Sequence, residues 1–250
     1  MNTMQAENLV KRYGVGETAV TAVRGINFGM EEGEFIAIMG ESGSGKSTLL
    51  SMLGALNTPT EGRYLVDDID VYALGSEQRA EFRREFLGFV FQSFHLIPYL
   101  SLIENVMLPV ATIRMSARQK RAMAETALDR VGLADKAKRL PNQISGGEQE
   151  RAAIARAIVN EPPLLLADEP TGNLDTKTGR EIMRLFQGLN RDGVTIIMVT
   201  HSHDAAEYAD RFLRISDGRL TEDERHVKTY EITGQDPFPE HKPMARFARL

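Results

Sequence analysis

The chain has 250 residues with no cysteine, 42% hydrophobic and 26% charged residues, and a formal net charge of −5 at pH 7. The hydrophobic fraction excludes a wholly disordered chain, and the negative charge disfavours proteins that coat nucleic acid or anionic lipid. The lack of cysteine excludes disulfides, cysteine-ligated zinc or iron–sulfur sites and thiol catalysis.

No stretch of the sequence has the pattern of a signal peptide or a membrane span. Residues 1–14 include Glu7, Lys11 and Arg12, which interrupt any apolar core near the start. The longest apolar runs, at 162–167 and 194–199, are far shorter than the ~18 residues that a bilayer requires. We therefore expect a soluble, cytoplasmic chain, which would need another chain to span a membrane.

Short β-rich runs alternate with helical patterns, which is typical of an α/β fold with a largely parallel sheet. We predict strands at residues 35–39, 164–167 and 195–199, and a helix at 48–53. The three strands are apolar enough to be buried on both faces. Polar residues follow each of them, at the strand ends where open α/β sheets bind ligands.

The middle of the chain has a more helical character, with predicted helices at 116–131 and 150–159. The organisation that we predict is a core of residues 1–92 and 158–220, an inserted helical subdomain of residues 93–157, and a C-terminal extension of residues 221–250. The extension contains several prolines and fits either an ordered appendage or a disordered tail. Residues 242–249 alternate basic and apolar side chains.

A glycine-rich segment directly follows the first predicted strand and matches the phosphate-loop pattern. Its residues are Gly40, Glu41, Ser42, Gly43, Ser44, Gly45, Lys46 and Ser47, and Thr48 begins the next helix. Glycines let successive backbone N–H groups converge on phosphate oxygens. Lys46 supplies a positive charge, the Ser47 hydroxyl can bind Mg²⁺, and the helix N-terminus favours anions. The segment therefore predicts a nucleoside triphosphate site.

Two acidic residues end the second predicted strand. Asp168 can hold Mg²⁺, and Glu169 can face the γ-phosphate and polarise a water molecule for in-line attack. The alternative is an ordinary acidic turn before Pro170. The phosphate loop earlier in the chain favours the functional interpretation.

The segment Ile144-Ser145-Gly146-Gly147-Glu148-Gln149 closely resembles the signature motif of ABC (ATP-binding cassette) ATPases. The resemblance covers roughly residues 4–220. It implies a P-loop NTPase fold with a RecA-like parallel sheet, an N-terminal antiparallel β region and an inserted α-helical subdomain. It also implies a head-to-tail dimer, in which the signature of each chain caps the γ-phosphate of ATP held by the other chain.

The same resemblance assigns roles to four further residues. Tyr13 is similar to the aromatic residue that stacks on adenine, although a plain strand aromatic is the alternative. Gln92 resembles the glutamine that reaches Mg²⁺ and the attacking water while it hinges the helical subdomain. Asp175 lies in a loop that resembles the one communicating across the dimer, and His201 resembles the histidine that contacts the γ-phosphate and orients Glu169.

One departure concerns the signature, where Ile144 and Glu148 replace the Leu and Gln that are more frequent in the family. We expect this departure to leave the site active. The phosphate loop, the segment 167–175 and the segment 89–98 look like those of ATPases from lipoprotein-releasing and macrolide-exporter systems. In that subfamily a coupling helix of the permease would dock near residues 93–104. The apolar stretch 94–100 there fits such docking or simple core packing.

These features predict an ABC ATPase that acts with ATP and Mg²⁺, as a dimer of two copies, on a separate transmembrane permease. The expected location is the cytoplasmic face of the inner membrane, and the expected cargo is a lipoprotein, lipid-like molecule, peptide or drug that is exported or released. One alternative is a regulatory mechanotransmitter that signals through a permease-like protein. Another is a soluble ABC ATPase that acts on ribosomes or DNA, which the single cassette and negative charge disfavour; we expect no nucleic-acid partner.

Overall fold

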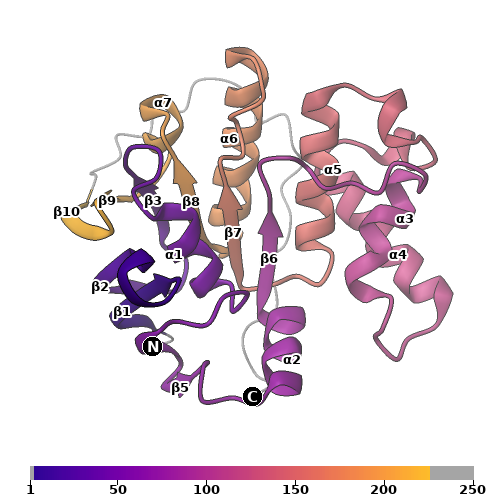
Figure 1. Cartoon of the computed structure of the whole chain (residues 1–250). Helices are drawn as coiled ribbons and strands as arrows, with labels where there is room; N and C mark the ends of the chain where they lie inside the picture. The colour runs from indigo at the N-terminus through magenta and orange to yellow at the C-terminus, as the bar shows by residue number, and fades with distance from the viewer. Residues whose placement is uncertain (1–2, 226–250) are drawn as a thin grey trace.

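The strands of the computed structural model, which describes residues 3–225, form two sheets (Figure 1). The larger sheet has six strands in the order β10 (Arg219–Arg225), β9 (Arg211–Ser216), β3 (Phe35–Met39), β8 (Thr195–Thr200), β7 (Leu164–Asp168) and β6 (Leu87–Val90). Four of its five strand pairings are parallel, and the fifth, between β10 and β9 at one edge, is antiparallel. This sheet is the predicted parallel core.

The smaller sheet is antiparallel and comes mostly from the N-terminal part of the chain. Its order is β2 (Val20–Glu31), β1 (Thr3–Tyr13), β4 (Glu61–Val66) and β5 (Ile69–Asp70). It corresponds to the antiparallel β region that the family resemblance implies. The structure thus has the expected α/β architecture of a P-loop NTPase.

The parallel sheet separates two hydrophobic cores, because successive side chains of a strand point to opposite faces. In β3, Phe35, Ala37 and Met39 belong to the core on one face, and Ile36 and Ile38 belong to the core on the other. All five side chains are buried, as the sequence predicts for an inner parallel strand.

Seven α-helices complete the described part of the chain. They are α1 (Lys46–Leu53), α2 (Ser76–Phe86), α3 (Leu102–Met107), α4 (Ala117–Arg130), α5 (Gly146–Ile158), α6 (Thr176–Arg191) and α7 (His203–Ala206). Short 3-10 turns lie at Gly16–Thr18, Leu108–Val110, Ala134–Lys136 and Pro141–Gln143.

Two helices begin earlier than the sequence predicts. Helix α1 begins at Lys46 rather than Thr48, and α5 begins at Gly146 rather than Glu150. The cause for α5 is a capping box: the Ser145 hydroxyl accepts from the Glu148 N–H at 3.3 Å, and the Glu148 carboxylate accepts from the Ser145 N–H at 2.9 Å. The two glycines therefore form the first turn of the helix.

Helices α3, α4 and α5 pack on one another at one side of the molecule (Figure 1). They lie within the predicted helical subdomain, residues 93–157, apart from the last residue of α5. Helix α5 also contacts β6 and α6. Helix α5 therefore connects the helical subdomain to the core that contains the parallel sheet.

The end of the described chain differs from the expectation for residues 221–250. The predicted core boundary at Leu220 lies inside β10, which pairs with β9 as far as Arg225. Residues 226–250, including the basic and apolar stretch 242–249, lie outside the described residues. Within the part that the structure describes, no helix has the length and apolar character to cross a bilayer.

Candidate functional site

The glycine-rich loop between β3 and α1 is held tightly against two neighbouring strands. A Cβ atom on Gly40 would lie 2.2 Å from the Ile215 carbonyl oxygen, and one on Gly45 would lie 2.2 Å from the Ala22 carbonyl oxygen. Both glycines have positive φ, 155° and 100°, so no other residue fits there without strain. Gly43 has a φ of 78° but faces open space. The loop is thus closed on one side and open on the other.

Lys46 lies inside this loop, with its ammonium group held by backbone carbonyls. Its Nζ donates to the carbonyl oxygens of Gly40 and Glu41, both at 2.8 Å, and no carboxylate among residues 3–225 pairs with it. The side chain of Ser44 is buried, and its hydroxyl has no hydrogen-bond partner in the same part of the chain. An unneutralised ammonium and an unpartnered hydroxyl in a loop of backbone N–H groups fit a bound phosphate chain.

Ser47 and Asp168 meet at the C-terminal edge of the parallel sheet. The Ser47 hydroxyl at the start of α1 donates to Asp168 Oδ1 at the end of β7 at 3.1 Å. Burial raises the pKa of Asp168, the Ser47 hydrogen bond opposes the shift, and the nearby Glu169 charge adds to it. A hydroxyl and a carboxylate at this spacing are the donor set that Mg²⁺ prefers, with phosphate oxygens as further ligands. No cluster of three or more acidic or histidine ligands occurs in residues 3–225.

Glu169 and His201 also meet, as the family resemblance implies. Glu169 Oε1 lies 2.9 Å from His201 Nδ1, and Glu169 Oε2 accepts from the His201 N–H at 3.4 Å. Glu169 has a φ of 50°, and its N–H donates to the Val199 carbonyl at 2.9 Å. This left-handed turn ends β7 and directs the carboxylate toward the end of β8. A positioned carboxylate beside a phosphate loop can act as a general base.

Gln92 follows β6 and lies against the loop after Glu169. Its carbonyl oxygen accepts from Asn173 Nδ2 at 2.8 Å, and a Cβ on Gly172 would lie 3.4 Å from its Nε2. The structure therefore brings Gln92 next to the loop that carries Glu169. Among the described residues, the Ser47 hydroxyl bonds Asp168 and forms no hydrogen bond with Gln92, the third residue expected to bind Mg²⁺.

Tyr13 is 44% exposed at the end of β1. Its hydroxyl accepts from Asn57 Nδ2 at 2.5 Å, and Lys11 Nζ lies 5.2 Å from the ring centroid. These contacts hold an accessible aromatic ring that can stack on a base. Sequence reasoning missed Asn57, because 44 residues separate it from Tyr13 and no local pattern links them.

The signature motif is built around the start of α5. A Cβ on Gly147 would lie 2.3 Å from the Thr178 side chain of α6, so the glycine permits close helix packing. Glu148 also forms an ion pair with Lys136, and this contact and the Ser145 N–H lower the Glu148 pKa to about 2. Its charge is thus neutralised within the chain. The Ser145 hydroxyl accepts from the Glu148 N–H at the exposed start of α5.

Asp175 has a structural task in the described chain. It caps α6, with Oδ1 accepting from the Lys177 and Thr178 N–H groups at 3.0 Å each and Oδ2 accepting from the Thr178 hydroxyl at 2.6 Å. The Thr178 hydrogen bonds lower the Asp175 pKa. No contact of Asp175 here points to a nucleotide.

The signature and the phosphate loop do not form one site within the chain. Strands β6 and β7 stand between α1 and α5 (Figure 1). Sequence reasoning also missed Arg156 on α5, which donates to the Phe94 and His95 carbonyls after Gln92. Nothing in the local sequence signals this contact, which spans about sixty residues.

Comparison with known proteins agrees with this geometry. The ABC transporter family matches residues 23–172, more than half of the chain. An uncharacterized ABC transporter ATP-binding protein of Bacillus subtilis, YvrO, is 48% identical over 218 residues, which cover 87% of this chain and 95% of that protein. The macrolide export ATP-binding/permease protein MacB of Rhodopirellula baltica is 48% identical over 227 residues, which cover 89% of this chain and 33% of MacB.

Solved structures extend the likeness to three dimensions. The dimeric structure of MJ0796, a bacterial ABC transporter cassette, has a TM-score of 0.82 at 44% identity and covers 89% of this chain and 98% of that chain. A dimeric post-hydrolysis structure of MJ0796 bound to ADP and Pi also has a TM-score of 0.82, at 43% identity and with the same shares of both chains covered. The chain therefore belongs to the ABC transporter ATP-binding proteins and is an ABC ATPase that binds ATP.

Proposed function

We propose that two copies of this chain hydrolyse ATP and power a separate membrane permease. The observation that carries the proposal is the Glu169–His201 pair, which lies beside the Ser47–Asp168 pair at the edge that holds the phosphate loop. The four side chains come from α1, β7 and the ends of β7 and β8. These side chains supply one acid–base group and one metal-binding pair beside the phosphate-binding loop.

In the proposed reaction, Lys46 and the loop N–H groups bind the phosphates, and Tyr13 stacks on adenine. Ser47, Asp168 and Gln92 would hold Mg²⁺, which would supply charge neutralisation for the phosphates. Glu169 accepts a hydrogen bond from water and directs it in line with the γ-phosphate, while His201 holds the Glu169 carboxylate in position.

The proposed active form is a head-to-tail dimer of two copies. Within one chain the Ser145 hydroxyl and the start of α5 lie apart from the phosphate loop, so they can contact a γ-phosphate only from a second copy. In this assignment, Ser145, Gly146 and Gly147 bind the partner's nucleotide, and Asp175 lies near the dimer interface. The MJ0796 cassettes are dimeric in both structures, which supports the proposal.

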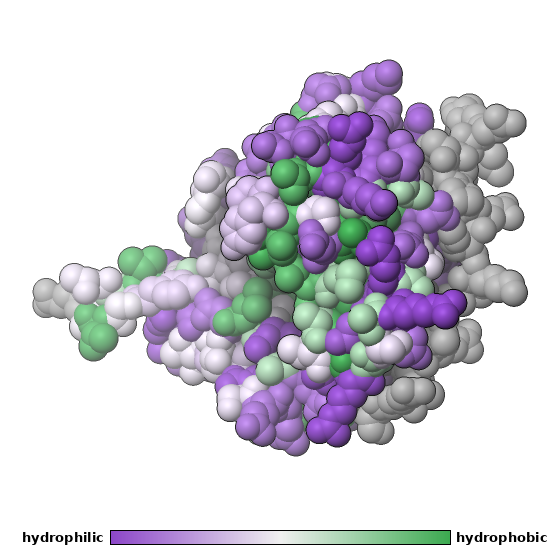
Figure 2. Space-filling view, turned by 90° about the vertical axis from the view of Figure 1, so that its right-hand side faces the viewer, coloured by the Kyte–Doolittle hydropathy of each residue, from purple (hydrophilic) through white to green (hydrophobic). Residues whose placement is uncertain are grey.

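The proposed permease surface is the loop after Gln92 with the neighbouring helical subdomain. Tyr99 is 78% exposed there, and Leu108 and Met115 are more than one third exposed. Figure 2 views the side of the molecule that carries α3, α4 and α5 and shows hydrophobic residues gathered among hydrophilic ones. The Asn105 amide fixes the loop, accepting from the Ile97 N–H at 2.7 Å and donating to three loop carbonyls. A rigid, partly apolar surface suits a permanent partner.

The proposed cargo is a lipoprotein, lipid-like molecule, peptide or drug, which the transporter exports or releases. MacB is named as a macrolide export protein with ATP-binding and permease parts, and this chain spans about one third of it. In this proposal the permease is a separate polypeptide, and this chain binds it at the cytoplasmic face of the inner membrane. A regulatory mechanotransmitter would use the same ATPase cycle without moving cargo.

A pull-down from detergent-solubilised native membranes tests the permease proposal. The tagged chain should bring down a stoichiometric permease, identified by mass spectrometry, and Tyr99→Glu should reduce its yield at least tenfold. Glu61→Gln, on β4 of the antiparallel sheet, serves as the control and should leave the yield unchanged. Recovery of ribosomes or soluble proteins alone would contradict the permease proposal, and the ATPase assignment would stand.

A further inference from the structure

A cleft of about 270 Å³ lies between α7 and the β9–β10 hairpin, outside the nucleotide site described above. Its lining combines three apolar residues, three glutamates, one arginine and one histidine: Met39, Ala206, Phe212, Glu207, Glu222, Glu224, Arg214 and His203. Met39 and Ala206 are buried and form an apolar floor. The carboxylates stand at the exposed rim.

The rim has an excess of negative charge. Glu222 is paired with Arg214 at 2.6 Å. Glu207 and Glu224 form no ion pair within residues 3–225, so two rim carboxylates remain without a cationic partner. A segment that presents positive charge around apolar side chains would complement this cleft in both respects.

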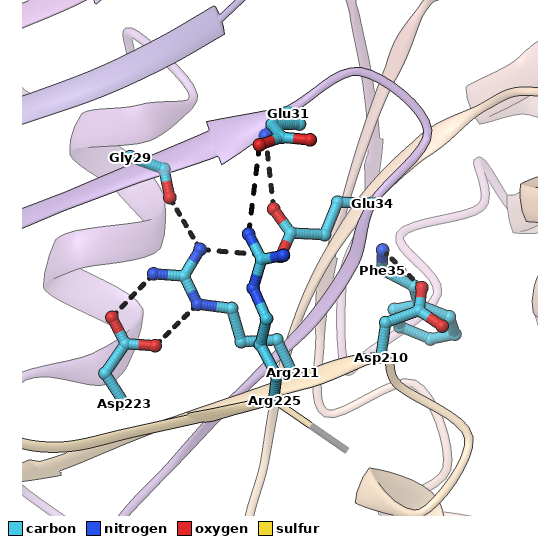
Figure 3. Close-up of polar contacts among 8 residues, drawn as sticks. All are labelled: Gly29, Glu31, Glu34, Phe35, Asp210, Arg211, Asp223 and Arg225. Atoms are coloured by element: carbon cyan, nitrogen blue, oxygen red, sulfur yellow. Dashed lines mark hydrogen bonds and ion pairs between the residues drawn. The ribbon is translucent and has the colours of Figure 1, made fainter. Parts of the chain in front are cut away.

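The wall formed by β10 is fixed from its other face, as Figure 3 shows. Arg211 bonds both oxygens of Asp223 at 2.5 Å and donates to the Gly29 carbonyl at 2.7 Å. Arg225 Nη2 lies 3.8 Å from Glu31 Oε1. Because side chains alternate along a strand, Asp223 and Arg225 face this anchor while Glu222 and Glu224 face the cleft.

The chain continues for 25 residues after Arg225, and its end has the required chemistry. Residues 241–250 contain Lys242, Arg246 and Arg249 and no acidic residue. Met244, Phe247 and Leu250 recur every third position among these basic residues. We propose that residues 242–250 bind in the cleft of their own chain, with these apolar side chains on its floor and the basic side chains at the Glu207 and Glu224 rim.

The connection favours the chain's own cleft over other occupants. The described chain ends at Arg225, next to Glu224, and sixteen residues join Arg225 to Lys242. A linker of that length spans about 20 Å and holds its end at an effective concentration on the order of millimolar. A second copy or an anionic membrane would have to compete with that local concentration.

Cross-linking in the full chain tests the proposal, because the chain has no native cysteine. His203→Cys on the cleft and Ala248→Cys should form a disulfide within one chain on mild oxidation. Glu32→Cys with Ala248→Cys is the matched control, because Glu32 adjoins Glu31, the contact of Arg225 on the opposite face. We expect the cleft pair to react at least fivefold faster than the control pair.

Three results would overturn the proposal: equal rates for the two pairs, a disulfide between two chains, or loss of the cleft disulfide when phosphatidylglycerol vesicles are added. The second would assign the segment to a second copy and the third to the membrane. Charge reversal adds an independent arm. Glu207→Lys with Glu224→Lys should slow the cleft reaction at least fivefold, and added Arg246→Glu with Arg249→Glu should restore it. Failure of this rescue would remove the proposed recognition, while ATP hydrolysis by the same variants reports separately on the proposed function.

Discussion

The Arg156 guanidinium donates to two consecutive backbone carbonyls, that of His95 at 2.5 Å and that of Phe94 at 2.6 Å. Phe94 and His95 both have left-handed backbone, with φ of 55° and 50°. This conformation is unfavourable for residues with a Cβ, so it needs an external tie. Arg156 supplies that tie from the helix that begins at the signature motif, and it holds the loop that follows Gln92.

We expect Arg156→Met to slow ATP hydrolysis about 10- to 100-fold, because charge-assisted hydrogen bonds are worth about 1.5–3 kcal/mol and the loop positions Gln92. The Kd for ATP should change less than about twofold, since Lys46 and the phosphate loop are untouched. The hydrolysis rate of Arg156→Lys, whose ammonium is a single point charge, should fall between those of the unmodified chain and Arg156→Met. Steady-state kinetics with Arg121→Met as control measure this; a raised KM at normal kcat would contradict the assignment.

Glu169→Gln should retain ATP binding and lose about 10²- to 10⁴-fold in hydrolysis, because the amide cannot accept a proton from the attacking water. Single-turnover phosphate release measures the chemical step, and nucleotide fluorescence measures binding. Glu125→Gln, an exposed residue of α4, is the matched control. Near-normal turnover of Glu169→Gln would remove Glu169 from the base role.

Ser145→Arg tests the dimer. In the Glu169→Gln background, ATP should drive two chains together, and light scattering should report a doubled mass. Adding Ser145→Arg should block this closure, because a long cationic side chain would replace the hydroxyl that we propose faces the partner's nucleotide. Unimpaired ATP-induced dimers of the double variant would contradict the signature assignment.

Two glycine substitutions should act on stability in opposite directions. Gly147→Ala would place a Cβ 2.3 Å from the Thr178 side chain and should destabilise the fold by ~1–3 kcal/mol. Gly188→Ala in α6 meets no atom within 4 Å and should stabilise the fold by about 0.5–1 kcal/mol, because alanine favours helix. Urea denaturation of both variants checks the pair. Equal effects would show that the α5–α6 contact relaxes freely.

Glu150 should make stability depend on pH. Both carboxylate oxygens are buried without a partner among residues 3–225, and burial raises the pKa of Glu150 to about 8, against the opposing charge of Arg156. The folded state then holds a proton that the unfolded state has released near pH 4.5. Stability from this group is present below that pH and is lost as the pH rises to about 8.

Glu150→Gln lacks this loss, so its Tm relative to the unmodified chain should increase between pH 5 and pH 8, by roughly 10 °C in total. Glu125→Gln should show a constant difference over the same range. A constant difference for Glu150→Gln as well would show that Glu150 is ionised in the folded chain.

The sequence predicts the inner strands well, since continuous apolar runs leave few alternatives. The expected strand at 35–39 matches β3, and β7 and β8 each extend one polar residue beyond the predicted ends. Strand β10 was not predicted, because its side chains are almost all polar and exposed. Its order depends on the Arg211–Asp223 pair, which exists only after β9 and β10 meet.

The same distinction applies to the site. The structure brings Ser47 to Asp168 and Glu169 to His201, as the motifs predict, and their roles stay predictions. The helix starts at Lys46 and Gly146 were placed too late, because glycine-rich turns look like loops until the cap forms. Residues that act by tertiary contact, such as Asn57 beneath Tyr13, carry no local signal.

Helix α5 is fixed at both ends by contacts of different kinds, which makes it a lever. The capping box holds its first turn, and Arg156 grips a loop near its other end. The eleven residues from Ser145 to Arg156 correspond to about 16 Å of helix, so a 10° tilt at the capped end would displace the grip by roughly 3 Å. One inserted residue between these points would turn Arg156 by about 100° around the helix axis and release the loop. The length of α5 thus determines how far the loop after Gln92 moves when the signature end of the helix rotates by a small angle.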